Sequence, residues 1–442
     1  MATLDSLPDE LVLHMLCVSE SADVVGRLAM ASRRYVLLAA DRALWKYMCL
    51  SHYGPPLHEH FETSGKDWRW LYRAQSRTAP STGTGVGAVI ARDHVYWGDT
   101  ADGLPHGYGL GLWVPTCHRV LGTGVRMRRD PNAATMSRNA TGEHRYEGQW
   151  RDGLMHGRGC RLYENGSCYK GEYRDGERHG HGALTRPGGW RYEGEWHNDD
   201  RNGHGVFTGF GGHCYQGGWH DGTRHGHGVY TWPDGQHYEG KWHIDKMHGR
   251  GALTWTGGRI EGEWRDDKVH GHGVFTWLNG NRYKGECQDG KKCGRGVFTW
   301  PNGTRYEGKW FDDDRCGHGV LTWPNGNRYV GLWHNGNRHG HGVSTWTSTG
   351  RHEHQQHGRD SPIDPRTSMD SQRHSGIWRN DRAHGPGYLT YTDGSVLRGV
   401  WCDSVLTDAK VTRHCAEECT DDACRCAAGR AAVIASHISA PS

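Results

Sequence analysis

Residues 226–242 read GHGVYTWPDGQHYEGKW, and the same pattern returns along the chain. Residues 294–310 read GRGVFTWPNGTRYEGKW, and residues 317–333 read GHGVLTWPNGNRYVGLW. The motif Tyr-x-Gly-x-Trp recurs about every 23 residues. A Gly-x-Gly motif begins eleven residues after the first residue of most copies. A fixed period of this length indicates a repeat protein. The clearest copies start at Tyr146, Tyr169, Tyr192, Tyr215, Tyr238, Ile260, Tyr283, Tyr306 and Tyr329, and degenerate copies start at Tyr96, His374 and Leu397.

Each repeat is predicted to be a hairpin of two short strands. Side chains alternate along a strand, so Tyr238, Gly240 and Trp242 share one face while Glu239 points to the other. The segment 233–235, Pro-Asp-Gly, has the residues of a tight turn. Because glycine has no Cβ, the Tyr and Trp rings of one strand can lie flat across the next strand.

The repeats predict a mainly β fold, an elongated single-sheet ribbon of stacked β-hairpins. One hairpin is marginally stable, whereas stacked hairpins support one another. Before this ribbon we expect a small all-α domain and a linker rich in Pro, Gly, Ser and Thr. After it we expect a disordered tail that contains cysteines. The expected boundaries are 1–76 for the helical domain, 77–92 for the linker, 93–401 for the ribbon with insertions near 114–142 and 347–371, and 402–442 for the tail.

Composition excludes several function classes. The 442 residues include 67 glycines, about twice the usual share, and only 35% are hydrophobic, which argues against a thick aliphatic core. A formal net charge of +3 favours neither nucleic acid nor strong attraction to a membrane surface. No signal peptide or membrane-spanning run is recognised, so the fourteen cysteines are expected to be free thiols in the cytoplasm. Catalytic motifs are not found, and we expect neither enzymatic activity nor a cofactor.

The repeat units resemble MORN repeats, which are marked by Tyr-x-Gly-x-Trp, a following Gly-x-Gly and an Asp-Gly or Asn-Gly turn. The resemblance covers residues 96–401. It implies an elongated β-sheet that serves as a scaffold for proteins and, in some members, for lipid head groups. We therefore expect a client protein, with lipid head groups as a further ligand class. The client-binding candidates are the aromatic residues Tyr238, Trp242, Tyr306 and Trp310.

Residues 7–45 resemble an F-box. The matching features are Leu7-Pro8-Asp9-Glu10-Leu11, Leu28, Ser32-Arg33-Arg34-Tyr35 and Leu44-Trp45. An F-box docks on the linker subunit of cullin–RING ubiquitin ligases, and the resemblance implies a docking surface that includes Leu7, Pro8, Leu11 and Leu28. The combination of an F-box with MORN repeats is similar to proteins of large amoeba-infecting DNA viruses. If this protein is viral, its expected location is the cytoplasm of the host cell.

Together the two resemblances predict a substrate-recruiting adaptor of an SCF-type ubiquitin ligase. In the alternative, the protein is a structural or membrane-apposed scaffold and the helical domain only caps the repeats. An enzyme with an unrecognised site is the third alternative. Binding of the linker subunit separates the first two.

Two groups of side chains have the residue types of metal ligands. Histidine pairs such as His225 and His227 recur along the strands, but successive repeats lie about 10 Å apart, so we expect a polar face and no metal site. The tail carries weak metal-ligand candidates at Cys415, Cys419, Cys424 and Cys426.

Overall fold

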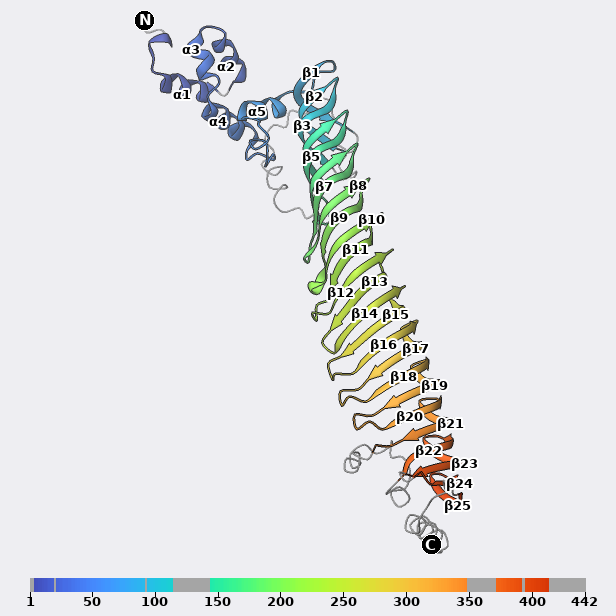
Figure 1. Ribbon diagram of the computed structural model, residues 1–442. Helices are drawn as coiled ribbons and strands as arrows, with labels where there is room; N and C mark the ends of the chain where they lie inside the picture. Colours follow the sequence, from blue (N-terminus) through green and yellow to red (C-terminus); the bar gives the residue numbers. More distant parts are fainter. Residues whose placement is uncertain are drawn as a thin grey trace. The chain divides into compact units, whose positions relative to one another are not determined.

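A computed structural model describes residues 4–19, 21–91, 94–113, 144–347, 371–391 and 394–412 (Figure 1). The chain divides after His225 into two compact units. The first unit begins with a helical head, whose elements are the 3₁₀-helix η1 (Leu4–Ser6) and the helices α1 (Asp9–Ser19), α2 (Ala22–Ala29), α3 (Arg33–Leu38), α4 (Arg42–Tyr53) and α5 (Trp68–Ser76).

Strands make up the rest of both units. The first unit contains β1 (Thr84–Ile90), β2 (His94–Ala101), β3 (Leu104–Trp113), β4 (His144–Arg151), β5 (Leu154–Leu162), β6 (Cys168–Arg174), β7 (Glu177–Arg186), β8 (Trp190–His197), β9 (Asp200–Thr208) and β10 (Cys214–His220), with the 3₁₀-helix η2 (Phe210–Gly212) before β10. Strand β11 (Thr223–Thr231) contains the division. The second unit continues with β12 (His237–His243), β13 (Lys246–Trp255), β14 (Gly258–Arg265), β15 (Lys268–Trp277), β16 (Arg282–Gln288), β17 (Lys291–Thr299), β18 (Arg305–Phe311), β19 (Asp314–Thr322), β20 (Arg328–His334), β21 (Asn337–Thr345), β22 (Ser371–Arg379), β23 (Arg382–Tyr391), β24 (Val396–Cys402) and β25 (Val405–Thr412).

The predicted fold class is confirmed. The described part of the chain is mainly β, with twenty-five strands of open antiparallel sheet after a small helical region. Within each unit, strands that follow one another in the sequence pair with one another. In the hairpin of β11 and β12, for example, Gly226 lies opposite Trp242 and Gly228 lies opposite Gly240.

Two kinds of turn alternate between the strands. The predicted turn at residues 233–235 is present, with Gly235 at φ 84° and its N–H donating to the carbonyl of Trp232. The second kind has only two residues, both left-handed. Asp152 and Gly153 after β4 have φ values of 49° and 83°. This is the turn that matches the twist of a hairpin, and it explains why Asp, Asn and Gly, which tolerate a left-handed backbone, are frequent at these two positions.

One face of the sheet carries rings that pack against one another. The Tyr238 side chain is fully buried, and its hydroxyl donates to the carbonyl oxygen of Lys241 at 3.0 Å. The Trp242 ring packs edge-on against Tyr238 with ring centres 5.2 Å apart, and its Nε1 donates to the carbonyl of Gly228. Tyr238 also packs against Trp264 of the following repeat at 5.3 Å, so the rings join one repeat to the next.

Glycine on the neighbouring strand makes room for each tyrosine. A Cβ placed on Gly251 would lie 2.2 Å from the Tyr238 hydroxyl, and a Cβ on Gly240 would lie 2.5 Å from the Cα of Gly251. The predicted role of the glycines, to let the rings lie across the sheet, is confirmed by this geometry.

The structure corrects two expected boundaries and leaves other segments outside its description. Strand β1 lies within 77–92, the segment expected to be a linker, because its residues pair in register with β2. Strand β25 lies within 402–442, the expected tail, and pairs with β24. The remainder of that tail lies outside the described residues, as do 114–143 and 348–370, which cover the expected insertions near 114–142 and 347–371 except for residues 347 and 371.

We predict that Gly240→Val destabilises the fold by about 1–3 kcal/mol, because the added methyl groups overlap the neighbouring strand. The matched control is Glu239→Val. It adds the same side chain one residue away on the exposed face and is expected to change stability by less than about 0.5 kcal/mol. Chemical denaturation of both variants checks this, and equal losses would contradict the assignment of the two faces.

Candidate functional site

The aromatic candidates for client binding are not accessible. Tyr238 and Tyr306 are fully buried, while Trp242 and Trp310 are 4% and 6% exposed. Their rings are used in packing between strands and between repeats. The expectation that these four side chains contact a client is therefore corrected: the sheet has no free aromatic surface at these positions.

The opposite face of the second unit carries a groove of about 1070 Å³. Its floor is made by glycines from successive strands, such as Gly262, Gly285 and Gly308. Around this floor stand the side chains that alternate with the buried rings. Six are basic and three are acidic: Arg250, Arg282, Lys284, Arg295, Arg305 and Lys309 against Glu261, Glu263 and Glu307. The groove is therefore net positive and suited to an extended acidic segment.

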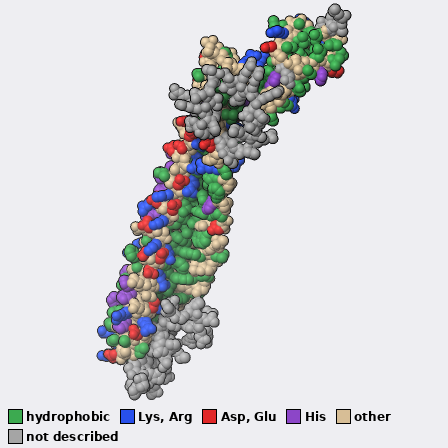
Figure 2. Space-filling view, turned by 180° about the vertical axis from the view of Figure 1, so that it is seen from behind, with side chains coloured by type: hydrophobic (Ala, Val, Ile, Leu, Met, Phe, Trp, Pro, Cys, Tyr) green, Lys and Arg blue, Asp and Glu red, His purple; other side chains and the backbone are tan. Residues whose placement is uncertain are grey.

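The helical head exposes an apolar stripe on α1. Leu11, Met15 and Val18 are 51%, 51% and 66% exposed and stand on one side of the helix, whereas Val12 and Leu16 on the other side are buried in the core of the head. Further exposed apolar side chains lie on α3, where Val36 and Leu37 are 51% and 74% exposed. Figure 2 shows hydrophobic side chains gathered over this head.

The four predicted docking residues differ in exposure. Pro8 and Leu11 are exposed, at the start of α1 and on its apolar stripe. Leu7 and Leu28 are half-buried and pack against the core of the head. The Ser32 side chain, part of the F-box-like pattern, accepts a hydrogen bond from the backbone N–H of Tyr35 and so caps α3.

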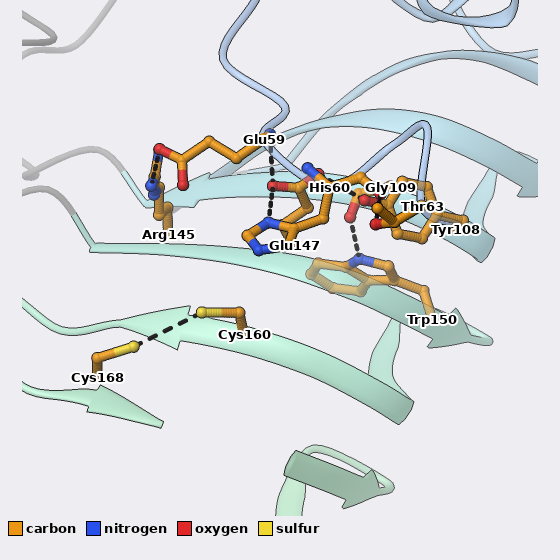
Figure 3. A network of polar contacts seen from close by, with 10 residues as sticks. All are labelled: Glu59, His60, Thr63, Tyr108, Gly109, Arg145, Glu147, Trp150, Cys160 and Cys168. Carbon is orange, nitrogen blue, oxygen red and sulfur yellow. Dashed lines mark hydrogen bonds and ion pairs between the residues drawn. The ribbon is translucent and has the colours of Figure 1, made fainter. Parts of the chain in front are cut away.

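The head is fastened to the first unit's polar sheet face by two carboxylates. The buried Glu147 of β4 accepts hydrogen bonds from the backbone N–H groups of Glu59 and His60, at 2.8 and 2.7 Å, and from the hydroxyl of Tyr108 (Figure 3). The Arg145 guanidinium forms an ion pair with Glu59 beside it. A backbone loop of the head is thus held by a side chain of the sheet.

Asp99 of β2 forms the second attachment. It accepts from the Trp70 indole at 2.6 Å, pairs with the Lys66 ammonium at 2.6 Å and accepts from the backbone N–H of Tyr108. The Trp70 ring also packs against the Tyr108 ring, with centres 5.7 Å apart. The junction therefore combines the polar contacts of the two carboxylates with the packing of the Trp70 and Tyr108 rings.

Electrostatics at the junction favour a charged Glu147. Burial alone would raise the pKa of this carboxyl, but the hydrogen bonds from Tyr108, Glu59 and His60 outweigh it and hold the pKa below its ordinary value. Burial lowers the pKa of the neighbouring His58, which keeps the imidazole neutral, although the charge of Glu147 opposes this effect. The junction thus contains one buried anion held by several donors.

Metal ligation and membrane spanning receive no support in the described part of the chain. No cluster of three or more His, Cys, Asp or Glu side chains there could hold a metal ion. The candidates at 415–426 lie outside the described residues. No helix in the described ranges is long and apolar enough to cross a membrane.

Sequence reasoning missed the polar groove and the junction for different reasons. The groove residues occupy the variable positions of Tyr-x-Gly-x-Trp, and the alternation of faces could have identified them once the rings were recognised as core. Nothing in the local sequence distinguishes Glu147 from Glu239, which stands at the same repeat position and is exposed. The two glutamates differ in exposure because the head packs over Glu147.

Comparison with known proteins supports the repeat assignment. The family model described as MORN repeat matches the segments 146–168, 169–191, 192–214, 215–237, 238–258, 261–282, 283–305, 306–328, 329–351 and 374–396. No curated protein matches the chain.

A solved structure that matches is the TCP domain of SAS-4 (dCPAP) from Drosophila melanogaster, in complex with a proline-rich motif of Ana2 (dSTIL). It is 9% identical, and the match covers 42% of this chain and 84% of that chain with a TM-score of 0.20. A similarity at this TM-score carries no argument about the present chain.

The family match, in contrast, covers more than half of the 442 residues and follows the strands described above. Nine of its ten segments begin at or one residue after a start position recognised from the repeat pattern between 146 and 329, and the tenth begins at the degenerate copy at His374. The chain belongs to the MORN repeat family.

Proposed function

We propose that this MORN repeat protein is a non-enzymatic adaptor of a cullin–RING ubiquitin ligase. The helical head docks on the linker subunit of the ligase, and the sheet holds the client protein. The observation that carries the proposal is the exposed apolar stripe of Leu11, Met15 and Val18, which lies in the segment that resembles an F-box. MORN repeats by themselves support the coarser role of a repeat scaffold that binds proteins.

The head has the physical properties of a docking module. Its core is closed by buried side chains such as Val12, Leu44 and Trp45, so the exposed stripe is not needed to hold the head together. Exposed apolar side chains that stand together on one helix are a common sign of a protein interface. The half-buried Leu7 and Leu28 border the same helices and remain proposed contacts.

The groove of the second unit suggests what kind of client the sheet binds. Its excess of basic side chains over acidic ones complements an acidic, extended segment. Such a client would bind through charge-assisted contacts, and the affinity would fall as salt screens them. Client binding on the polar face replaces the earlier assignment to the buried rings, and the proposed location is the cytoplasm, that of the host if the protein is viral.

A scaffold whose head only caps the repeats is the competing function. The exposed stripe argues against it, because a cap has to cover the sheet and gains nothing from apolar side chains in solvent. The junction at Glu147 also suits an adaptor, since it holds the head on the first strands of the sheet.

We predict that the full-length protein binds purified linker subunit, and that Leu11→Asp with Met15→Asp weakens binding at least about tenfold, or 1.4 kcal/mol. Both side chains are about half exposed, so the charge is introduced at the interface and not in the core. Calorimetric titration measures the affinity, and far-ultraviolet circular dichroism checks that the head remains helical.

The control for this experiment is Leu278→Asp, which places the same charge at an apolar side chain that is 82% exposed in a turn of the sheet. It should bind as tightly as the wild type. Failure of the wild-type protein to bind the linker subunit would overturn the proposed adaptor function and favour the competing scaffold function.

We also predict that Glu147→Gln loosens the junction by about 1–3 kcal/mol at neutral pH, because the donors around it lose a charged acceptor. Hydrogen exchange of the Glu59 and His60 amides should accelerate, whereas Glu239→Gln, at the exposed equivalent position, should leave both unchanged. Unaltered exchange in Glu147→Gln would show that the carboxylate does not hold the head.

The pH dependence of the junction has a definite sign. Because the pKa of Glu147 is lowered on folding, its contribution is present above the ordinary glutamate pKa of about 4.3 and is lost as the pH falls through the lowered value. The difference in stability between wild type and Glu147→Gln should therefore shrink below about pH 4. Thermal melting of both proteins between pH 7 and pH 3 measures it.

A further inference from the structure

Two cysteines meet on the polar face beside the head junction. Cys160 lies on β5 opposite Glu147 and Lys170, and Cys168 lies at the start of β6 opposite Leu162. Their sulfur atoms are 3.6 Å apart (Figure 3). Both side chains are half-buried and have access to solvent. The two thiols therefore form a diagonal cross-strand pair on one hairpin.

Among the strands that the structure describes, this pair occurs in one repeat. The position of Cys160 is occupied by small apolar residues in other hairpins, at Ala183, Val206, Ala252, Val274, Val297, Val320 and Val343. The position of Cys168 is occupied by arginine at several sites, such as Arg259, Arg282 and Arg305. Neither cysteine is needed to form the repeat, because the same hairpin is built without them elsewhere.

The surroundings favour a thiolate on Cys168. The hydrogen bond with Cys160 lowers the pKa of Cys168 to about 6 in spite of burial, and the positive charges of Arg145 and Lys170 act in the same direction. The hydrogen bond and burial raise the pKa of Cys160, which stays a neutral thiol. One thiolate next to one thiol is the arrangement in which a nucleophile has a second cysteine ready to resolve its oxidised form.

We propose that Cys160 and Cys168 form a peroxide-sensitive dithiol site that is converted reversibly into an intramolecular disulfide. The Cys168 thiolate attacks one oxygen of hydrogen peroxide, which breaks the O–O bond, forms a sulfenic acid and releases hydroxide. The sulfur of Cys160 then attacks the sulfenic sulfur, forms the S–S bond and loses its proton, and water leaves. Peroxide is reduced, and the two thiols are oxidised by two electrons.

The disulfide should be easy to reduce again. Diagonal neighbours on paired strands have Cβ atoms up to about 7 Å apart, which is wider than the spacing that an unstrained disulfide prefers. A strained and solvent-accessible disulfide has a higher reduction potential and returns readily to the thiols. The site is thus suited to reversible modification and not to permanent stabilisation of the hairpin.

Peptide mapping tests the product. Trypsin cleaves after Arg158, Arg161 and Lys170, so the two cysteines fall on separate peptides. After mild treatment of the full-length protein with hydrogen peroxide, a non-reducing digest should contain 159–161 linked to 162–170, and dithiothreitol should separate them. Cys214 is the matched control, because it stands at the position equivalent to Cys168 with Val206 in place of the second thiol. It should form no such link.

Alkylation rates test whether Cys160 is what lowers the pKa of Cys168. At pH 6 a thiol of pKa about 6 is half ionised, against about 0.3% for an ordinary thiol of pKa 8.5. The lower nucleophilicity of the more acidic thiolate reduces this advantage to about tenfold in rate. The Cys160→Val variant, which carries the residue found in other repeats, should therefore alkylate at Cys168 about tenfold more slowly at pH 6 than the wild type. Circular dichroism checks that the repeat is intact.

Two results would overturn the proposal. One is a peroxide-treated protein without the linked peptide while other cysteines are oxidised. The other is a Cys168 alkylation rate that Cys160→Val leaves unchanged. In that variant the peroxide product of Cys168 should instead be trapped by dimedone as a sulfenic acid, because the resolving thiol is gone.

Discussion

The whole sheet depends on a tyrosine ring that lies on a glycine of the next strand. Tyr238 above Gly251 illustrates the contact, in which a Cβ would come within 2.2 Å of the hydroxyl oxygen. The ring needs the empty position, and the glycine, which would weaken an isolated strand, is stabilised by the ring that covers it. Since the Tyr238 ring also packs edge-on against Trp242 of its own repeat and Trp264 of the following one, such contacts join neighbouring hairpins.

Because the tyrosine rings need glycine beside them, the two faces of the sheet have different roles. The tyrosines and tryptophans of the repeated motif, such as Tyr238 and Trp242, are buried by the packing of the sheet on itself, whereas the polar face presents charged side chains. The protein uses that face for its own head, through Glu147 and Asp99, and the groove of the second unit offers a basic version of the same surface. The way in which Glu147 holds backbone N–H groups of the head is an internal example of how this face binds a polypeptide.

Much of the fold could be predicted from the sequence because it rests on local rules repeated many times. The alternation of Tyr238, Gly240 and Trp242 identifies a strand face, and Asp-Gly pairs identify the turns. The site was predicted less well. The exposure of an aromatic side chain depends on what its neighbours leave open, so the motif around Trp242 does not reveal that adjacent rings bury this side chain. The strand β1 within residues 77–92 was missed because pairing with β2, and not composition, makes it a strand.

The most direct test of this account is a spectrophotometric titration of the tyrosines in the folded full-length protein. Burial raises the pKa of the repeat tyrosines, including Tyr192, Tyr238 and Tyr306, above the ordinary value of about 10. We predict that these tyrosines stay protonated above pH 10 and ionise only together with unfolding. Reversible ionisation of all tyrosines near pH 10 in the folded protein would contradict it, because the rings would then lie free on the surface of the sheet.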